Sequence, residues 1–164
     1  MLRRFILLVL MVALTLIPVS ALAQGTQKGR IMHATGTFNV TIGKAEASDI
    51  GKSAGIGRMT IDKVWSGAIE GTSKGEMLST SEANGAMAYV ALEKMTVKVN
   101  GRSGTFVFTH GATMLASDPV SGVLEVKVVP SSGTGELQGL EGKLSITVDK
   151  SGHSYDFAYT LPDS

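Results

Sequence analysis

Period-two alternation of apolar and polar residues runs through most of this chain, and it constrains the fold more than any other feature. In residues 143–149, leucine, isoleucine and valine alternate with lysine, serine, threonine and aspartate, and residues 37–42 and 154–161 repeat the pattern. Successive side chains of a strand point to opposite faces, so this pattern is typical of strands that bury one face. No stretch shows a helical apolar stripe over ten or more residues. We therefore expect an all-β fold, with residues 44–54 as either a short helix or a loop.

Turn signals divide the alternating pattern into short segments. Asn84-Gly85, Asn100-Gly101 and Ser121-Gly122 are dipeptides that favour tight turns. Consecutive hairpins without long crossovers favour an eight-stranded antiparallel up-and-down β-barrel, because closure of the sheet removes exposed strand edges. The predicted strands span residues 31–42, 56–65, 67–81, 86–99, 102–115, 121–129, 143–149 and 153–161.

The first 23 residues differ from the rest of the chain and have the pattern of a secretory signal peptide. Two arginines precede a nearly unbroken apolar run over residues 5–17, and Ala21-Leu22-Ala23 has the small-x-small form of a cleavage site. The apolar run is too short for a membrane span. We predict cleavage after Ala23, a secreted or periplasmic location and no membrane span after cleavage. A flexible lead-in over 24–30 and a single β-barrel domain over 31–164 would follow.

The charge and the missing residue types exclude several classes of function. The chain has 15 basic and 14 acidic residues, and cleavage removes two arginines, so the exported protein lacks the basic surface of a nucleic-acid-binding protein. It has no cysteine, which excludes disulfides, a thiolate nucleophile and a lipid-anchored cysteine. The three histidines are far apart in sequence, and no metal or nucleotide motif is present. We therefore expect neither a metal nor a cofactor.

The strand register can be predicted best for the hairpin around Asn100-Gly101. This dipeptide favours a two-residue type I′ turn, which pairs Val99 with Arg102. Tyr89 and the paired residues share one face of the hairpin, which is the apolar face and is expected to line the barrel interior. His110 would then lie diagonally from both Glu93 and Tyr89. The predicted pairs are Met95 with Phe106, Glu93 with Phe108, and Ala91 with His110.

Glu93 is the residue of this hairpin that most needs an explanation, because a buried carboxylate is costly unless it is paired or protonated. One interpretation is a structural glutamate satisfied by His110, Tyr89, backbone or water. A second is a catalytic acid or base with a raised pKa in a ligand cavity, supported by Tyr89 or His110. A third is a bulge that turns Glu93 outward, since a one-residue slip moves every side chain to the other face.

The register of the preceding hairpin, around Asn84-Gly85, has two alternatives. One places Glu76 opposite Glu93, and the other places Gly75 there. In the first register two carboxylates would share the interior, and the pKa of one of them would rise. The two alternatives therefore lead to different chemistry around Glu93.

An apolar patch is expected on the outer face of the strand that carries Glu93. With a regular register, Ala88, Val90 and Leu92 all point outward. Either a bulge intervenes in this strand, or the patch is a subunit contact in a homo-oligomer.

Six inward-facing residues with large side chains are candidates for the wall of a ligand site. For the single tryptophan, core packing and ligand stacking are both open interpretations. Two tyrosines of the last strand are either core residues with hydrogen-bonded hydroxyls or ligand contacts. The six candidates are Trp65, Met95, Phe106, Phe108, Tyr155 and Tyr159.

The segments that carry these candidates resemble a bacterial family of small proteins classed as a domain of unknown function. The matching motifs are Tyr89-Val-Ala-Leu-Glu93, Gly101-Arg-Ser-Gly-Thr-Phe106 with His110, the glycine-rich residues 128–142, and a closing strand with Tyr155 and Tyr159. Known members of that family are similar to the allene oxide cyclase and dirigent β-barrels. The resemblance implies an eight-stranded, oligomeric, allene oxide cyclase-like barrel and no established activity.

Three functional hypotheses follow from the residues and the resemblance. The first is a barrel that binds a small apolar or amphipathic molecule in its interior. The second is a cofactor-free isomerase or cyclase that uses Glu93 as acid or base, with Tyr89 or His110 in support. The third is a structural or subunit-interaction barrel with a filled interior.

Overall fold

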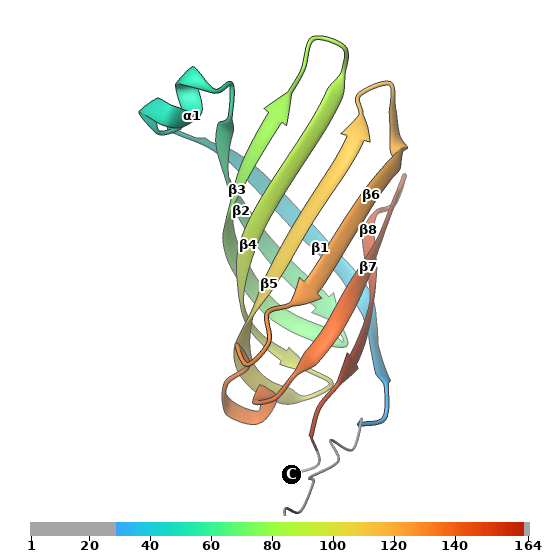
Figure 1. Cartoon of the computed structure of the whole chain (residues 1–164). Helices are drawn as coiled ribbons and strands as arrows, with labels where there is room; N and C mark the ends of the chain where they lie inside the picture. The colour runs from blue at the N-terminus through green and yellow to red at the C-terminus, as the bar shows by residue number, and fades with distance from the viewer. Residues whose placement is uncertain (1–28, 163–164) are drawn as a thin grey trace, which may run out of the picture.

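The computed structural model describes residues 29–162, apart from the side chains of residues 119–121. The chain forms a closed barrel of eight antiparallel strands that follow one another in sequence order (Figure 1). The strands are β1 (Met32–Ala45), β2 (Gly57–Gly67), β3 (Ile69–Ser81), β4 (Ala86–Val99), β5 (Arg102–Leu115), β6 (Asp118–Val128), β7 (Glu141–Asp149) and β8 (Gly152–Thr160). A short helix α1 (Asp49–Ser53) and a 3-10 turn η1 (Gly135–Leu137) complete the fold.

The predicted all-β, eight-stranded antiparallel barrel is therefore confirmed. The bounds of β4 and β5 are the predicted ones, and β6 begins three residues earlier than predicted. Residues 44–54 contain the short helix α1, which begins after Ser48, whose hydroxyl accepts a hydrogen bond from the backbone N–H of Gly51. The predicted signal peptide, its cleavage site and most of the predicted lead-in lie outside the described residues.

The β4–β5 hairpin has the predicted register, and its turn explains why. Asn100 and Gly101 both have positive φ, at 47° and 84°, as a type I′ turn requires. The pairs Met95–Phe106, Glu93–Phe108 and Ala91–His110 are all present. The pairing of β3 with β4 places Gly75 opposite Glu93, so the second of the two predicted registers holds. Strands β3 and β5 both pair with β4 in unbroken register. This rules out the bulge that would have turned Glu93 outward.

The half of the barrel near η1, which is the lower half in Figure 1, is filled with apolar side chains. Phe106, Phe108 and Phe157 are fully buried and pack against one another, with ring centroids 4.9 to 6.0 Å apart. The Tyr155 hydroxyl accepts a hydrogen bond from the backbone N–H of Ile69, and that of Tyr159 accepts one from the side-chain amide of Asn100. This half therefore has a close-packed core with its tyrosine hydroxyls satisfied.

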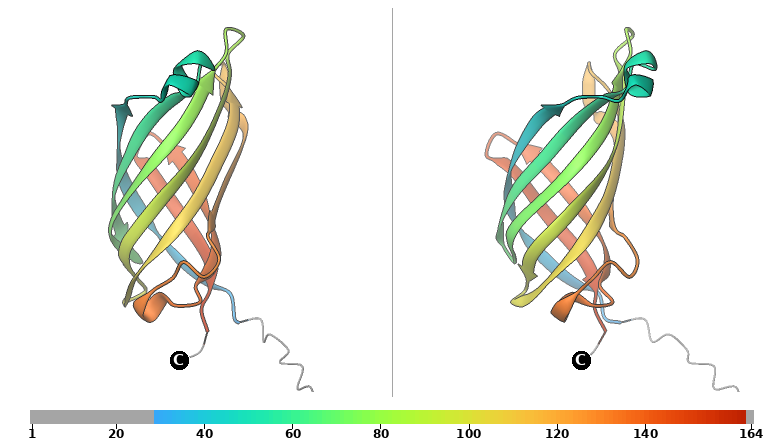
Figure 2. Two further views of the ribbon diagram at one scale, coloured as in Figure 1. Left: turned by 60° about the vertical axis from the view of Figure 1, so that its left-hand side comes forward. Right: turned by 90° about the vertical axis from the view of Figure 1, so that its left-hand side faces the viewer.

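The glycine-rich loop after β6 closes the lower end of the barrel, as Figures 1 and 2 show. It runs beside the start of β5, where the backbone N–H groups of Val107 and Thr105 donate to the hydroxyls of Ser132 and Thr134. This close approach needs Gly104, because a Cβ there would clash with the carbonyl oxygen of Thr134. The loop then inserts Leu137 and Leu140, both fully buried, into the core. The segment is thus a closing corner of the barrel.

The opposite end of the barrel has different surroundings. Figure 2 shows α1 and the β3–β4 turn at this end, while η1 lies at the other. β6 and β7 pair at a single described register position, Lys127 opposite Lys143, next to the loop that closes the lower end. From there towards the end that carries α1, no further register pair joins these two strands among the described residues. No helix of the described residues is long and apolar enough to cross a membrane.

Candidate functional site

A cavity of about 650 Å³ occupies the upper half of the barrel and opens at the end that carries α1, where Gly55 and Gly57 line it. Its wall is mostly apolar, with four methionines from four strands: Met59, Met77, Met87 and Met114. Met59 pairs with Met77 across β2 and β3, and Met87 pairs with Met114 across β4 and β5. The interior is therefore packed at one end and hollow at the other.

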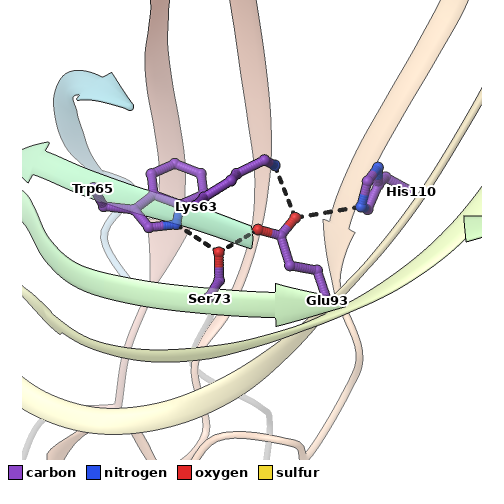
Figure 3. A network of polar contacts seen from close by, with 5 residues as sticks. All are labelled: Lys63, Trp65, Ser73, Glu93 and His110. Atoms are coloured by element: carbon purple, nitrogen blue, oxygen red, sulfur yellow. Dashed lines mark hydrogen bonds and ion pairs between the residues drawn. The ribbon is translucent and has the colours of Figure 1, made fainter. Parts of the chain in front are cut away.

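A network of buried polar side chains lies between the packed half and the cavity (Figure 3). The Lys63 ammonium donates to Glu93 Oε2 at 2.8 Å, and the Ser73 hydroxyl donates to Glu93 Oε1. Trp65 Nε1 donates in turn to the Ser73 hydroxyl at 2.8 Å. His110 Nε2 lies 3.3 Å from Glu93 Oε2, in a close contact that is not aligned as a hydrogen bond. Both carboxylate oxygens of Glu93 are thus satisfied, as burial of a charge requires.

Strand alternation and register bring these residues together. Lys63 and Ser73 are directly opposite each other on β2 and β3, and both point inward. Ser73 and Glu93 are diagonal neighbours across β3 and β4, and so are Glu93 and His110 across β4 and β5. Diagonal neighbours are within reach of long side chains. The predicted diagonal relation of His110 to Glu93 is therefore present, and Lys63 and Ser73 add to it.

The surroundings of Glu93 hold its carboxyl ionised. Burial alone would raise its pKa, but the contact with His110, the charge and hydrogen bond of Lys63 and the hydrogen bond of Ser73 together lower the pKa to about 2. The alternative with a raised pKa did not include the buried lysine, and these surroundings shift the pKa in the opposite direction. Glu93 is also only 1% exposed and does not line the cavity. The geometry corresponds to the structural interpretation of this residue.

Tyr89 and His110, the other two catalytic candidates, do line the cavity. Their rings meet edge to face, with centroids 5.8 Å apart. Burial and the negative charge of Glu93 raise the pKa of the Tyr89 hydroxyl, so this group stays protonated. Together the two rings form part of the cavity wall directly above the Glu93 network.

The six predicted ligand contacts lie in the packed half and do not line the cavity. Each has an inward position, as expected, but packing below the polar network covers it. The side chains that face the cavity come from the upper parts of the strands instead. The six buried residues are Trp65, Met95, Phe106, Phe108, Tyr155 and Tyr159, all at most 4% exposed.

Lys63 and Ser73 are the residues of the polar network that the sequence analysis missed, although the sequence carries a signal for the lysine. Lys63 alternates with Ile61 and Trp65, so it occupies an inward position of a strand. An inward lysine and an inward glutamate in a small barrel are expected to form an ion pair, because neither charge is stable when buried alone. Its ammonium also lies over the rings of Phe38 and Trp65, 4.7 and 5.2 Å from their centroids.

Comparison with known proteins places this geometry in a family. Residues 34–159 match the family described as Protein of unknown function (DUF3224). The chain belongs to the DUF3224 family. A crystal structure of a DUF3224 protein of unknown function from Shewanella oneidensis MR-1 is similar to it, with 36% sequence identity and a TM-score of 0.73. That similarity covers 82% of this chain and 100% of the Shewanella chain. A search of curated proteins found no match.

Family membership confirms the predicted resemblance to a family of small proteins of unknown function with a barrel fold. The predicted outer patch of this DUF3224 barrel is present as a surface feature. Val90 and Leu92 are 62% and 61% exposed on a regular stretch of β4, with Leu78 of β3 beside them. A subunit contact at this patch stays a prediction. No cluster of three or more histidine, aspartate or glutamate side chains among the described residues could hold a metal.

We expect the stability of the DUF3224 barrel to fall in acid because Glu93 must take up a proton. Its pKa is about 2 in the folded chain and near 4.5 when exposed, so its stabilising effect is complete above about pH 4.5 and is lost as the pH falls towards 2. The shift corresponds to a loss of about 3 kcal/mol. Unfolding by denaturant at a series of pH values measures the loss of stability, and NMR titration of the Glu93 carboxyl carbon measures its pKa in the folded chain. A Glu93 titration midpoint at or above 4.5 would contradict this prediction.

Proposed function

We propose that this DUF3224 protein is an exported binding protein that holds one small apolar or amphipathic molecule in the upper half of its barrel. The observation that carries the proposal is the open cavity of about 650 Å³ above a packed core. Ligand sites in proteins commonly measure about 300–1,000 Å³ and combine apolar walls with a few polar groups. The cavity wall has this composition, and an eight-stranded barrel has room for one such ligand.

The methionines of the wall support a ligand that is apolar and variable in shape. Methionine is flexible and polarizable, so it adapts to irregular surfaces and is frequent at binding sites that accept several partners. Met59 and Met77 stand on one side of the cavity, and Met87 and Met114 on another. We therefore expect shape tolerance at the cavity wall.

Export is part of this proposal and rests on the sequence of residues 1–23. It fits a chain without cysteine, because the barrel core can be stable without disulfides. The intact mass of the protein recovered from the periplasm or medium tests it. A chain that begins at Gln24 is the expected result, and retention of residues 1–23 would contradict export by this route.

Binding of a neutral apolar fluorophore, N-phenyl-naphthylamine, tests the cavity. We expect saturable binding to the native protein, and a Met77→Trp substitution should weaken it about tenfold or more, because an indole in the wall takes up the space of the ligand. Leu78→Trp is the matched control, since Leu78 is the next residue of β3 and points to the outer face. The control should bind the fluorophore like the native protein.

Two outcomes would overturn the proposed function. One is failure of the fluorophore to bind the folded native protein. The other is weaker binding to Leu78→Trp together with unchanged binding to Met77→Trp. The second outcome would place binding in the shallow outer groove that Leu78 and Val90 line.

A further inference from the structure

We propose that the cavity selects amphipathic ligands with one uncharged oxygen acceptor, such as an ester or ketone carbonyl, at the end of an apolar chain, and that this acceptor lies at the cavity floor beside Lys63. This inference rests on the proposed function and adds to it the chemistry and the orientation of the ligand. It is carried by the polar groups that reach the cavity and by the balance of charge among them.

The first step concerns which polar groups a ligand would meet. The nitrogen-bearing side chains that line the cavity are Lys63, His110 and His153, and no aspartate or glutamate among the described residues lines it. Lys63 is 8% exposed, so a ligand that meets its ammonium does so in surroundings that exclude most water. A ligand with an acceptor oxygen has a charged partner there. A cationic ligand meets no carboxylate among the described residues that line the cavity, and only the hydroxyls of Ser79, Thr80, Ser81 and Tyr89.

The second step concerns the free hydrogen-bonding capacity of Lys63. An ammonium group has three donors. Among the described residues, Lys63 Nζ makes one hydrogen bond, to Glu93 Oε2, and it is otherwise flanked by the aromatic faces of Phe38 and Trp65. Donors therefore remain available for a ligand oxygen, and a hydrogen bond to a charged, desolvated donor is stronger than one between neutral groups.

The third step uses the charge balance to choose between an uncharged and an anionic acceptor. The Lys63 ammonium already neutralises the Glu93 carboxylate at 2.8 Å. An anionic ligand would bring a second negative charge to the same ammonium, close to a buried carboxylate that cannot move away. A carbonyl oxygen takes the free donor without this repulsion. The floor therefore favours an uncharged acceptor.

The fourth step concerns orientation. Lys63 lies at the boundary between the cavity and the packed core and belongs to the Glu93 network shown in Figure 3. The methionine wall continues from there towards the open end. An acceptor at one end of a chain can reach the floor while the apolar part lies against methionine. An acceptor in the middle of the chain reaches the closed floor only if the chain folds back so that both arms point towards the open end.

Displacement of N-phenyl-naphthylamine from the native protein by ligands of similar length tests the proposal. We expect methyl octanoate to bind about tenfold more tightly than octanoate, octylamine or octane. Butyl pentanoate has the same composition as methyl octanoate with its carbonyl in the middle of the chain, and it should bind several-fold more weakly. Equal affinity of the two esters would overturn the orientation, and tighter binding of octanoate or octylamine would overturn the charge argument.

A variant tests whether the acceptor oxygen of the ligand binds at Lys63. The double substitution Lys63→Met with Glu93→Gln removes both buried charges together, and it should abolish the preference for methyl octanoate over octane. Persistence of that preference in the folded double variant would overturn the assignment to Lys63. If the variant does not fold, the comparison of ligands on the native protein still decides. Failure of the fluorophore itself to bind would count against the proposed function, whereas fluorophore binding without a preference for the ester counts against this inference alone.

Discussion

Lys63→Met is expected to lower the free energy of unfolding by about 3–5 kcal/mol, because it leaves the Glu93 carboxylate buried without its ion pair. Glu93 is 1% exposed and Lys63 is 8% exposed, so the carboxylate has little access to water that could replace the lost ammonium. Ser73 still donates to one carboxylate oxygen, but the oxygen that faced Lys63 keeps only the poorly aligned contact with His110. Unfolding of the native and variant proteins in denaturant at neutral pH measures the difference.

Lys74→Met is the matched control for this prediction. Lys74 lies on β3 and pairs with Asp62 on the outer face, where the two side chains are 80% and 51% exposed. Loss of a solvent-exposed pair of this kind costs at most about 1 kcal/mol. The double variant Lys63→Met with Glu93→Gln should recover part of the loss, because it no longer contains a buried charge. Equal effects of Lys63→Met and Lys74→Met would show that the buried pair does not stabilise the barrel.

Phe157→Ala is expected to destabilise the protein by about 3–5 kcal/mol, because it opens a void in the packed half of the barrel. Phe157 is fully buried and contacts three other rings, those of Phe106, Phe108 and Tyr159, with centroids 5.1 to 6.0 Å away. The surrounding strands belong to one closed sheet and cannot collapse freely into the void. Thermal or denaturant unfolding measures the loss.

Met77→Ala provides the contrast in the hollow half. Met77 faces the cavity and is only half-buried, so its truncation enlarges an existing space and removes few packing contacts. We expect a change within about 1 kcal/mol. If Met77→Ala destabilised the protein as much as Phe157→Ala, the two halves of the barrel would not differ in packing as the structure indicates.

Local pattern was enough to predict the strands and one complete register. The side of the sheet on which Glu93 lies stayed open until the unbroken pairing of β4 ruled out a bulge. The Asn100-Gly101 turn accepts positive φ at both positions, and this local property fixes the pairing of β4 with β5. Every inward position of that hairpin then follows from the two-residue period. The register of β3 with β4 stayed open between Glu76 and Gly75, because the sequence did not define the length of the turn that contains Asn84-Gly85.

Only the tertiary structure decided the environment of Glu93 and the place of the cavity. Lys63 and Glu93 are far apart in sequence, and β3 lies between their strands, so their contact depends on curvature of the closed barrel. Inward residues follow the same two-residue period along the whole length of each strand. The period therefore does not show which half of the barrel interior is packed and which half is hollow. That depends on the loop that inserts Leu137 and Leu140 at one end and leaves the methionine-lined end open. Strand identity is a local property of the sequence, whereas ion pairing and cavity volume arise from segments that meet only in the folded chain.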